Sequence, residues 1–141
     1  MTTSEGDAAL LKIIETLRDG QAFYEEAAQG APSPRMRQLF TRMAEERQNG
    51  IVKLAPYVQT SLPEDESWTN LADRLYADFH ALLGDPDAIF LDKLREYEAE
   101  LLETIREASP AVPEGAARDA VEDVHEACLR TQRTMPEPGE A

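Results

Sequence analysis

Apolar residues recur every three or four positions along most of the chain, and no stretch alternates apolar and polar residues over the length of a strand. This spacing is typical of amphipathic helices. It predicts an all-α protein with five helices, which span about residues 6–29, 33–56, 67–83, 85–108 and 114–133. Turns that contain proline or glycine separate them.

Two of the predicted helices carry a clear start signal. Ser33 precedes Pro34, and Asp85 precedes Pro86. A serine or aspartate side chain caps the free N–H groups of a helix, and proline fits its first position. Pro56 kinks or ends the second helix.

Four of the helices are about 20 residues or longer, or about 30 Å each, and the one over 67–83 is shorter. The simplest arrangement is a four-helix bundle made of two helical hairpins, with the short helix in the crossover between them. A plain array of five helices is the alternative.

The length of 141 residues fits one domain, which we assign to residues 1–134. Residues 135–141 contain two prolines, a glycine and two glutamates, and they predict a flexible acidic tail. The polar, acidic start predicts that there is no signal peptide. The longest apolar runs span four residues, so no transmembrane helix is expected.

The composition limits the classes of partner that the protein is expected to bind. The chain has 28 acidic and 14 basic residues, a formal net charge of −14. Such acidity argues against binding to nucleic acid or to an anionic membrane, since both require clustered Lys and Arg. Cys128 is the single cysteine, so no intramolecular disulfide can form, and a reducing cytoplasm fits. Bundles of this size often form homo-oligomers, and the sequence names no partner.

Polar residues that fall on the apolar helix faces are the candidates for chemistry. They form a predicted polar core layer of Gln21, Tyr24, Arg47 and Glu98. A buried arginine keeps its charge and needs a carboxylate partner. Glu98 is the acid placed well inside an apolar face, so the pattern favours an Arg47–Glu98 pair that fixes the helix register. The alternative is that these groups line a small site.

A second set of residues has the chemistry of metal ligands. Glu122 and His125 are three residues apart at the edge of the apolar face of the last helix, so both side chains could reach one ion. Glu46 lies at the margin of the apolar face of the second predicted helix. Together with Glu98, these carboxylate and imidazole groups suit iron, manganese or zinc.

These residues resemble the pattern of the ferritin-like superfamily, in which two helices each give a Glu and two others each give Glu-x-x-His to a pair of metal ions. Glu122-Asp-Val-His125 has the spacing of one such motif, and Glu98 would be a single Glu. The run Glu45-Glu46-Arg47-Gln48-Asn49 looks like the second motif without its histidine.

The chain also resembles a bacterial family of uncharacterised ferritin-like four-helix-bundle proteins, a domain of unknown function. The stretches 17–28, 39–47 and 124–126 carry this resemblance. It implies a ferritin-like fold and metal ligands at Glu46, Glu98, Glu122 and His125. The second histidine is absent, the first helix has no central acid, and Arg47 would repel a cation. The di-metal site is therefore expected to be incomplete.

Two functions follow from this pattern. The first is a non-catalytic binding or scaffold protein without a cofactor, built around the polar layer. The alternative is a metal-binding protein for iron, manganese or zinc that is involved in iron handling or oxidative stress. A contact between Arg47 and Glu98 in the interior would favour the first, and a cluster of the four proposed ligands would favour the second.

Overall fold

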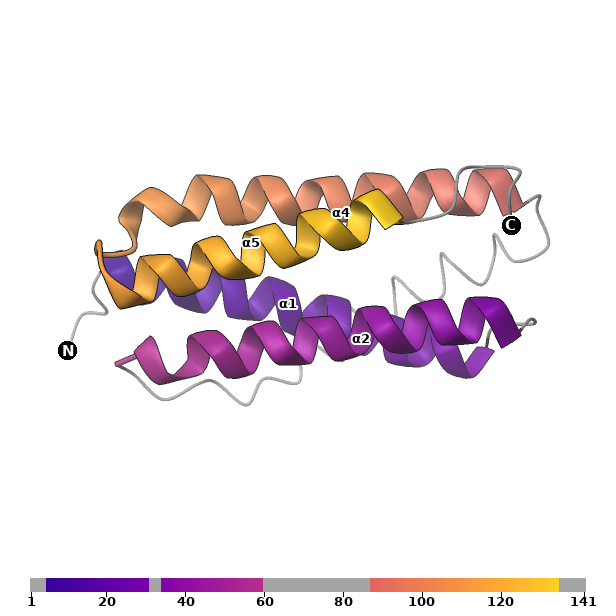
Figure 1. The fold of residues 1–141 in the computed structure, drawn as a ribbon, viewed down its shortest axis with the longest axis horizontal. Coiled ribbons are helices and arrows are strands. Elements are labelled where there is room, and N and C mark those ends of the chain that lie inside the picture. The colour runs from indigo at the N-terminus through magenta and orange to yellow at the C-terminus, as the bar shows by residue number, and fades with distance from the viewer. Residues whose placement is uncertain (1–4, 31–33, 60–86, 135–141) are drawn as a thin grey trace.

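The computed structural model describes residues 5–30, 34–59 and 87–134. These residues form four α-helices and no strand (Figure 1). The helices are α1 (Glu5–Gly30), α2 (Pro34–Leu54), α4 (Asp87–Ala108) and α5 (Ala116–Thr134), and two short 3-10 helices, η1 (Ala55–Tyr57) and η2 (Ser109–Ala111), follow α2 and α4. The all-α prediction is confirmed for these residues. The helix predicted over 67–83 and the tail over 135–141 lie outside them.

The start of α1 contacts the segments that follow α2 and α4. The Asp7 carboxylate in the first turn of α1 accepts the backbone N–H of Gln59, just beyond η1, at 2.8 Å. Gly6 lies so close to Pro113 that an added Cβ would be 2.8 Å from the proline ring. The start of α1 and the ends of α2 and α4 therefore share one end of the molecule.

This arrangement fixes the direction of each helix. α1 is antiparallel to α2 and to α4, α5 is antiparallel to both of its neighbours, and α2 and α4 run in the same direction (Figure 1). In the packing, α1 contacts α2 and α4, and α5 contacts α4 and α2. The four helices thus close into a bundle around one interior.

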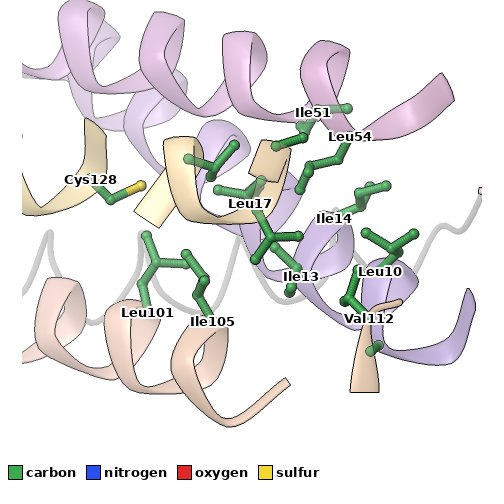
Figure 2. Packing of buried hydrophobic residues seen from close by; sticks show 14 residues of the cluster. Leu10, Ile13, Ile14, Leu17, Ile51, Leu54, Leu101, Ile105, Val112 and Cys128 are labelled. Atoms are coloured by element: carbon green, nitrogen blue, oxygen red, sulfur yellow. The ribbon is translucent and has the colours of Figure 1, made fainter. Parts of the chain in front are cut away.

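The larger apolar cluster takes side chains from all four helices and from the connection between α4 and α5 (Figure 2). Leu10, Ile14 and Leu17 of α1 are buried there, as their spacing predicts. Ile13, which lies beside the row formed by these three residues, is also buried. Since α1 packs against two helices, its buried face is wider than one row of residues.

A second, more aromatic cluster lies between the end of α1 and the start of α2. Its buried members are Phe23, Tyr24, Ala27, Leu39, Phe40, Met43 and Ala44, and Tyr97 of α4 packs against them. The rings of Tyr24 and Phe40 stack with their centroids 6.1 Å apart. The polar groups of the interior lie next to this cluster.

Replacement of Leu17 by alanine tests the apolar core. The Leu17 side chain is fully buried in the larger cluster, so its truncation should lower the free energy of unfolding by about 2–5 kcal/mol. The exposed Val52, whose truncation should change it by less than about 0.5 kcal/mol, is the control. Urea denaturation followed by circular dichroism measures both, and equal effects would contradict the packing.

Candidate functional site

A charged residue lies on the buried face of α2. Arg47 follows Met43 by one helical turn and precedes Ile51 by another, so the periodicity that buries these residues also turns Arg47 inward. On α4, Glu98 lies about one helical turn before the buried Leu101 and two turns before the buried Ile105. Arg47 and Glu98 are both 0 % exposed. The helix patterns thus carry two opposite charges into the interior.

The guanidinium of Arg47 is held from several sides. Its Nη2 donates a hydrogen bond to Oε2 of Glu98, and the two side chains form a buried ion pair. Its Nη1 donates to Oε1 of Glu46 at 3.0 Å and to Sγ of Cys128 at 3.3 Å. The guanidinium carbon also lies 5.7 Å from the centroid of the Tyr24 ring, within the range of a cation–π contact.

The carboxylates that face Arg47 have further donors. The hydroxyl of Tyr24 donates to Oε1 of Glu98, and the hydroxyl of Thr131 donates to Oε2 of Glu46. Every oxygen of the two carboxylates therefore accepts a hydrogen bond. We call these six side chains the Arg47 network: Tyr24 from α1, Glu46 and Arg47 from α2, Glu98 from α4, and Cys128 and Thr131 from α5. The network joins all four helices.

The electrostatics keep the guanidinium charged. Burial alone would lower the pKa of Arg47, but the carboxylate of Glu98 and the other acidic groups around it raise the pKa above its ordinary value. Burial, followed by the charge of Glu98, raises the pKa of Tyr24 well above that of a free tyrosine. Tyr24 is therefore a neutral hydrogen-bond donor at physiological pH.

The pKa values of Glu46 and Cys128 in the Arg47 network are shifted as well. Burial raises the pKa of Glu46, although the guanidinium of Arg47 opposes this shift. Burial also raises the pKa of the Cys128 thiol to about 12. A thiol with this pKa carries almost no thiolate at neutral pH, so Cys128 is a poor nucleophile.

A glycine in α1 makes room for the guanidinium. A Cβ added to Gly20 would lie 3.2 Å from Nε of Arg47 and 3.3 Å from the hydroxyl oxygen of Tyr97. Among the described residues, nothing accepts a hydrogen bond from this Nε. Gly20 therefore allows α1 to pass close to the edge of Arg47.

The structure brings together only part of the predicted polar layer. Tyr24, Arg47 and Glu98 contact one another directly. Gln21 is half-buried, and its side-chain amide donates to the exposed Glu25 at 3.0 Å instead. Because the buried face of α1 includes Phe23 and Ala27, Gln21 lies at its flank.

Two members of the Arg47 network were not among the sequence-derived candidates. Cys128 is buried on the apolar face of α5, and Thr131 follows it by three residues, which places both on one side of the helix. The spacing from Cys128 therefore indicates that Thr131 lies near the buried face of α5. The spacing does not predict that Thr131 bonds to Glu46 on α2, because this contact depends on how the two helices align.

The four proposed metal ligands do not meet at one point. Glu46 and Glu98 both contact Arg47. Glu122 is exposed and His125 is half-buried, and both line a separate pocket of about 320 Å³ near the α4–α5 connection. In the part of the chain that the structure describes, no three His, Cys, Asp or Glu side chains are grouped to hold a metal ion.

The Arg47 network also does not fit a pair of metal ions. The oxygens of Glu46 and Glu98 already accept hydrogen bonds from Arg47, Tyr24 and Thr131. A guanidinium that stays charged would repel a divalent cation placed beside it.

A groove of about 680 Å³ leads from the surface toward the Arg47 network between α2 and α5. Glu46 and Cys128 of the Arg47 network are among its lining residues. The Lys53 ammonium and the Asp123 carboxylate, both about half exposed, pair across the two helices at 2.9 Å, and Arg42, Glu45, Glu126 and Arg130 complete the charged lining.

Asp19 is a second perturbed carboxyl group, on α1 beside Gly20. Its Oδ1 is buried and has no hydrogen-bond partner among the described residues. Burial, and then the charge of Glu15 one turn earlier, raises its pKa to about 6. Asp19 is therefore ionised at neutral pH, and its buried charge lowers the free energy of unfolding.

These features define a helical-bundle protein with a fully buried ion pair at its centre. The chain belongs to the family described as a domain of unknown function, DUF2383, whose family model matches residues 7–110. The match includes Tyr24, Arg47 and Glu98, whereas Cys128 and Thr131 lie beyond it. No curated protein and no solved structure matches the chain significantly. Within the described residues, no helix is long and apolar enough to cross a membrane.

The Arg47–Glu98 pair can be tested with a double-mutant cycle. Arg47→Met leaves the Glu98 carboxylate buried without its counter-charge and should lower the free energy of unfolding by about 3–5 kcal/mol. Arg47→Met combined with Glu98→Leu removes both charges, so it should cost clearly less than the sum of the two single variants. Urea denaturation measures the cycle.

The exposed Lys53–Asp123 pair is the matched control, because its loss should cost less than about 1 kcal/mol. Additive effects of the Arg47 and Glu98 variants, within about 0.5 kcal/mol, would show that the two buried charges do not interact.

Asp19→Asn should stabilise the protein at neutral pH. The pKa of Asp19 is about 6 in the folded state and 3.8 as an ordinary carboxyl group, so the folded state loses stability as pH rises through this window. Solvent screening of this half-buried group limits the gain to about 1 kcal/mol at pH 7. Thermal unfolding at pH 7 and pH 4 should show the gain at pH 7 and little of it at pH 4. Glu122→Gln controls for the loss of one surface charge, and an equal gain at both pH values would refute the assignment.

Proposed function

We propose that this protein is a non-catalytic binding or scaffold protein with a ferritin-like arrangement of four helices, in which an ion pair replaces the metal centre. The parallel direction of α2 and α4 supports the ferritin-like arrangement, because one long crossover between two helical hairpins is a feature of that fold.

The observation that carries this proposal is the position of the Arg47 guanidinium between Glu98 and Glu46. A metal centre needs carboxylates with free lone pairs around a space that can accept a cation. Here the carboxylates face a cation that belongs to the protein itself, and every one of their oxygens accepts a hydrogen bond. Such a centre stabilises one arrangement of the helices and offers no ready position for a substrate.

Binding would then take place at the surface, and the groove between α2 and α5 is the proposed region. Its lining carries both signs of charge from two helices, which suits a polar partner more than an apolar one. We place the protein in the cytoplasm, since the protonated, buried thiol of Cys128 needs no oxidising environment. A homo-oligomer is compatible with this role.

Metal analysis of the wild-type protein tests the proposal against the metal-binding alternative. Protein purified without chelators, and protein loaded aerobically with iron or incubated with manganese or zinc, should contain well under one metal ion per chain and keep an unchanged Tm. Elemental analysis and thermal unfolding are the two measurements.

His125→Ala is the matched variant for this experiment, because it removes the imidazole of the Glu122-x-x-His125 motif without touching the Arg47 network. Stoichiometric metal in the wild type that disappears in His125→Ala would overturn the scaffold proposal and establish the metal-binding one.

A further inference from the structure

The acceptors around Arg47 have the arrangement of a cation-binding site. Carboxylate oxygens of Glu98 and Glu46 and the sulfur of Cys128 come from three different helices and converge on one guanidinium group. The face of the Tyr24 ring adds a fourth contact, of the kind that favours cations. The cation in this site is the guanidinium of Arg47, which is part of α2.

The acceptors of this site are positioned independently of the cation. Glu98 is fixed by the hydroxyl of Tyr24, and Glu46 is fixed by the hydroxyl of Thr131. Neither hydrogen bond involves Arg47. The carboxylates should therefore keep their positions in a folded protein from which the guanidinium has been removed.

The geometry suits a planar cation that donates hydrogen bonds. The contacts of Nη1 with Glu46 and Cys128 are 3.0 and 3.3 Å long, whereas zinc needs its ligands at about 2.0–2.3 Å. The acceptors are distributed over two different nitrogens of one fork, which matches the fixed plane of a guanidinium.

We infer that the Arg47 network is a binding site for a small planar cation of the guanidinium class, occupied in the native protein by its own arginine. Glu46 and Cys128 line both this site and the groove between α2 and α5, so the groove gives a free cation a route from solvent. The inference extends the proposed function, since it states which cation the centre takes in place of a metal.

The test is chemical rescue of Arg47→Ala. Guanidinium chloride up to about 50 mM, far below the concentrations that denature proteins, is added to the variant, and thermal unfolding is recorded. The Tm of Arg47→Ala should rise by a few degrees, on the order of 5 °C, and saturate. If the variant is unfolded in buffer, the same titration should restore its helical circular dichroism.

Three controls make the result specific. Urea has the shape of guanidinium without its charge and should give no rise. Arg42→Ala removes an exposed arginine from the same helix and should not respond to guanidinium. Arg47→Ala combined with Glu98→Gln lacks the principal carboxylate and should lose the response.

The inference is overturned if guanidinium does not raise the Tm or the helicity of Arg47→Ala, if urea acts equally, or if Mn²⁺ or Zn²⁺ rescues the variant and guanidinium does not. These outcomes test the guanidinium site in Arg47→Ala. The proposed function is tested separately, by the metal content of the wild-type protein, so the failure of one proposal can be distinguished from the failure of the other.

Discussion

The ion pair between Arg47 and Glu98 is the interaction on which the centre of this bundle depends. Arginine stays protonated at physiological pH, so a fully buried guanidinium must find hydrogen-bond acceptors and a counter-charge on the helices around it. α4 supplies the counter-charge, α5 supplies a thiol and a hydroxyl, and α1 supplies Tyr24 together with the small residue Gly20. The apolar residues drive the helices together, but these polar contacts specify how they meet.

Specificity of this kind has a physical basis. A bundle of Leu, Ile and Val can slide by one helical turn with little loss, because one apolar contact replaces another. If α4 slid by one turn, Glu98 would move by about 5.4 Å and Arg47 would be left without its carboxylate. The cost of an unpaired buried charge, about 3–5 kcal/mol, is large against the total stability of a small domain. The pair thus penalises the alternative registers more than it stabilises the native one.

The sequence predicted the helices and their inward faces well, because both follow from local periodicity. α2 ends at Leu54, before Pro56, and Arg47 and Glu98 are buried as their positions on the apolar faces indicate. Gln21 shows the limit: it belongs to the predicted polar core layer, but α1 packs against two neighbours, and its buried face includes Phe23 and Ala27 rather than Gln21. The contact between Thr131 and Glu46 could not be predicted, since it joins residues 85 positions apart on two helices whose alignment is a property of the whole bundle.

The same limit applies to the Glu122-x-x-His125 spacing as a sign of a central metal site. A spacing of three residues places two side chains on one face of a helix, but it does not say which face points to the interior. The buried face of α5 is formed by Val121, Val124 and Cys128, so the positions of Glu122 and His125 fall outside it. In a helical bundle, a ligand motif is evidence for a central site only when its residues are in phase with the apolar positions. Arg47 and Glu98 meet that condition, and for this reason they form an ion pair in the interior of this acidic protein.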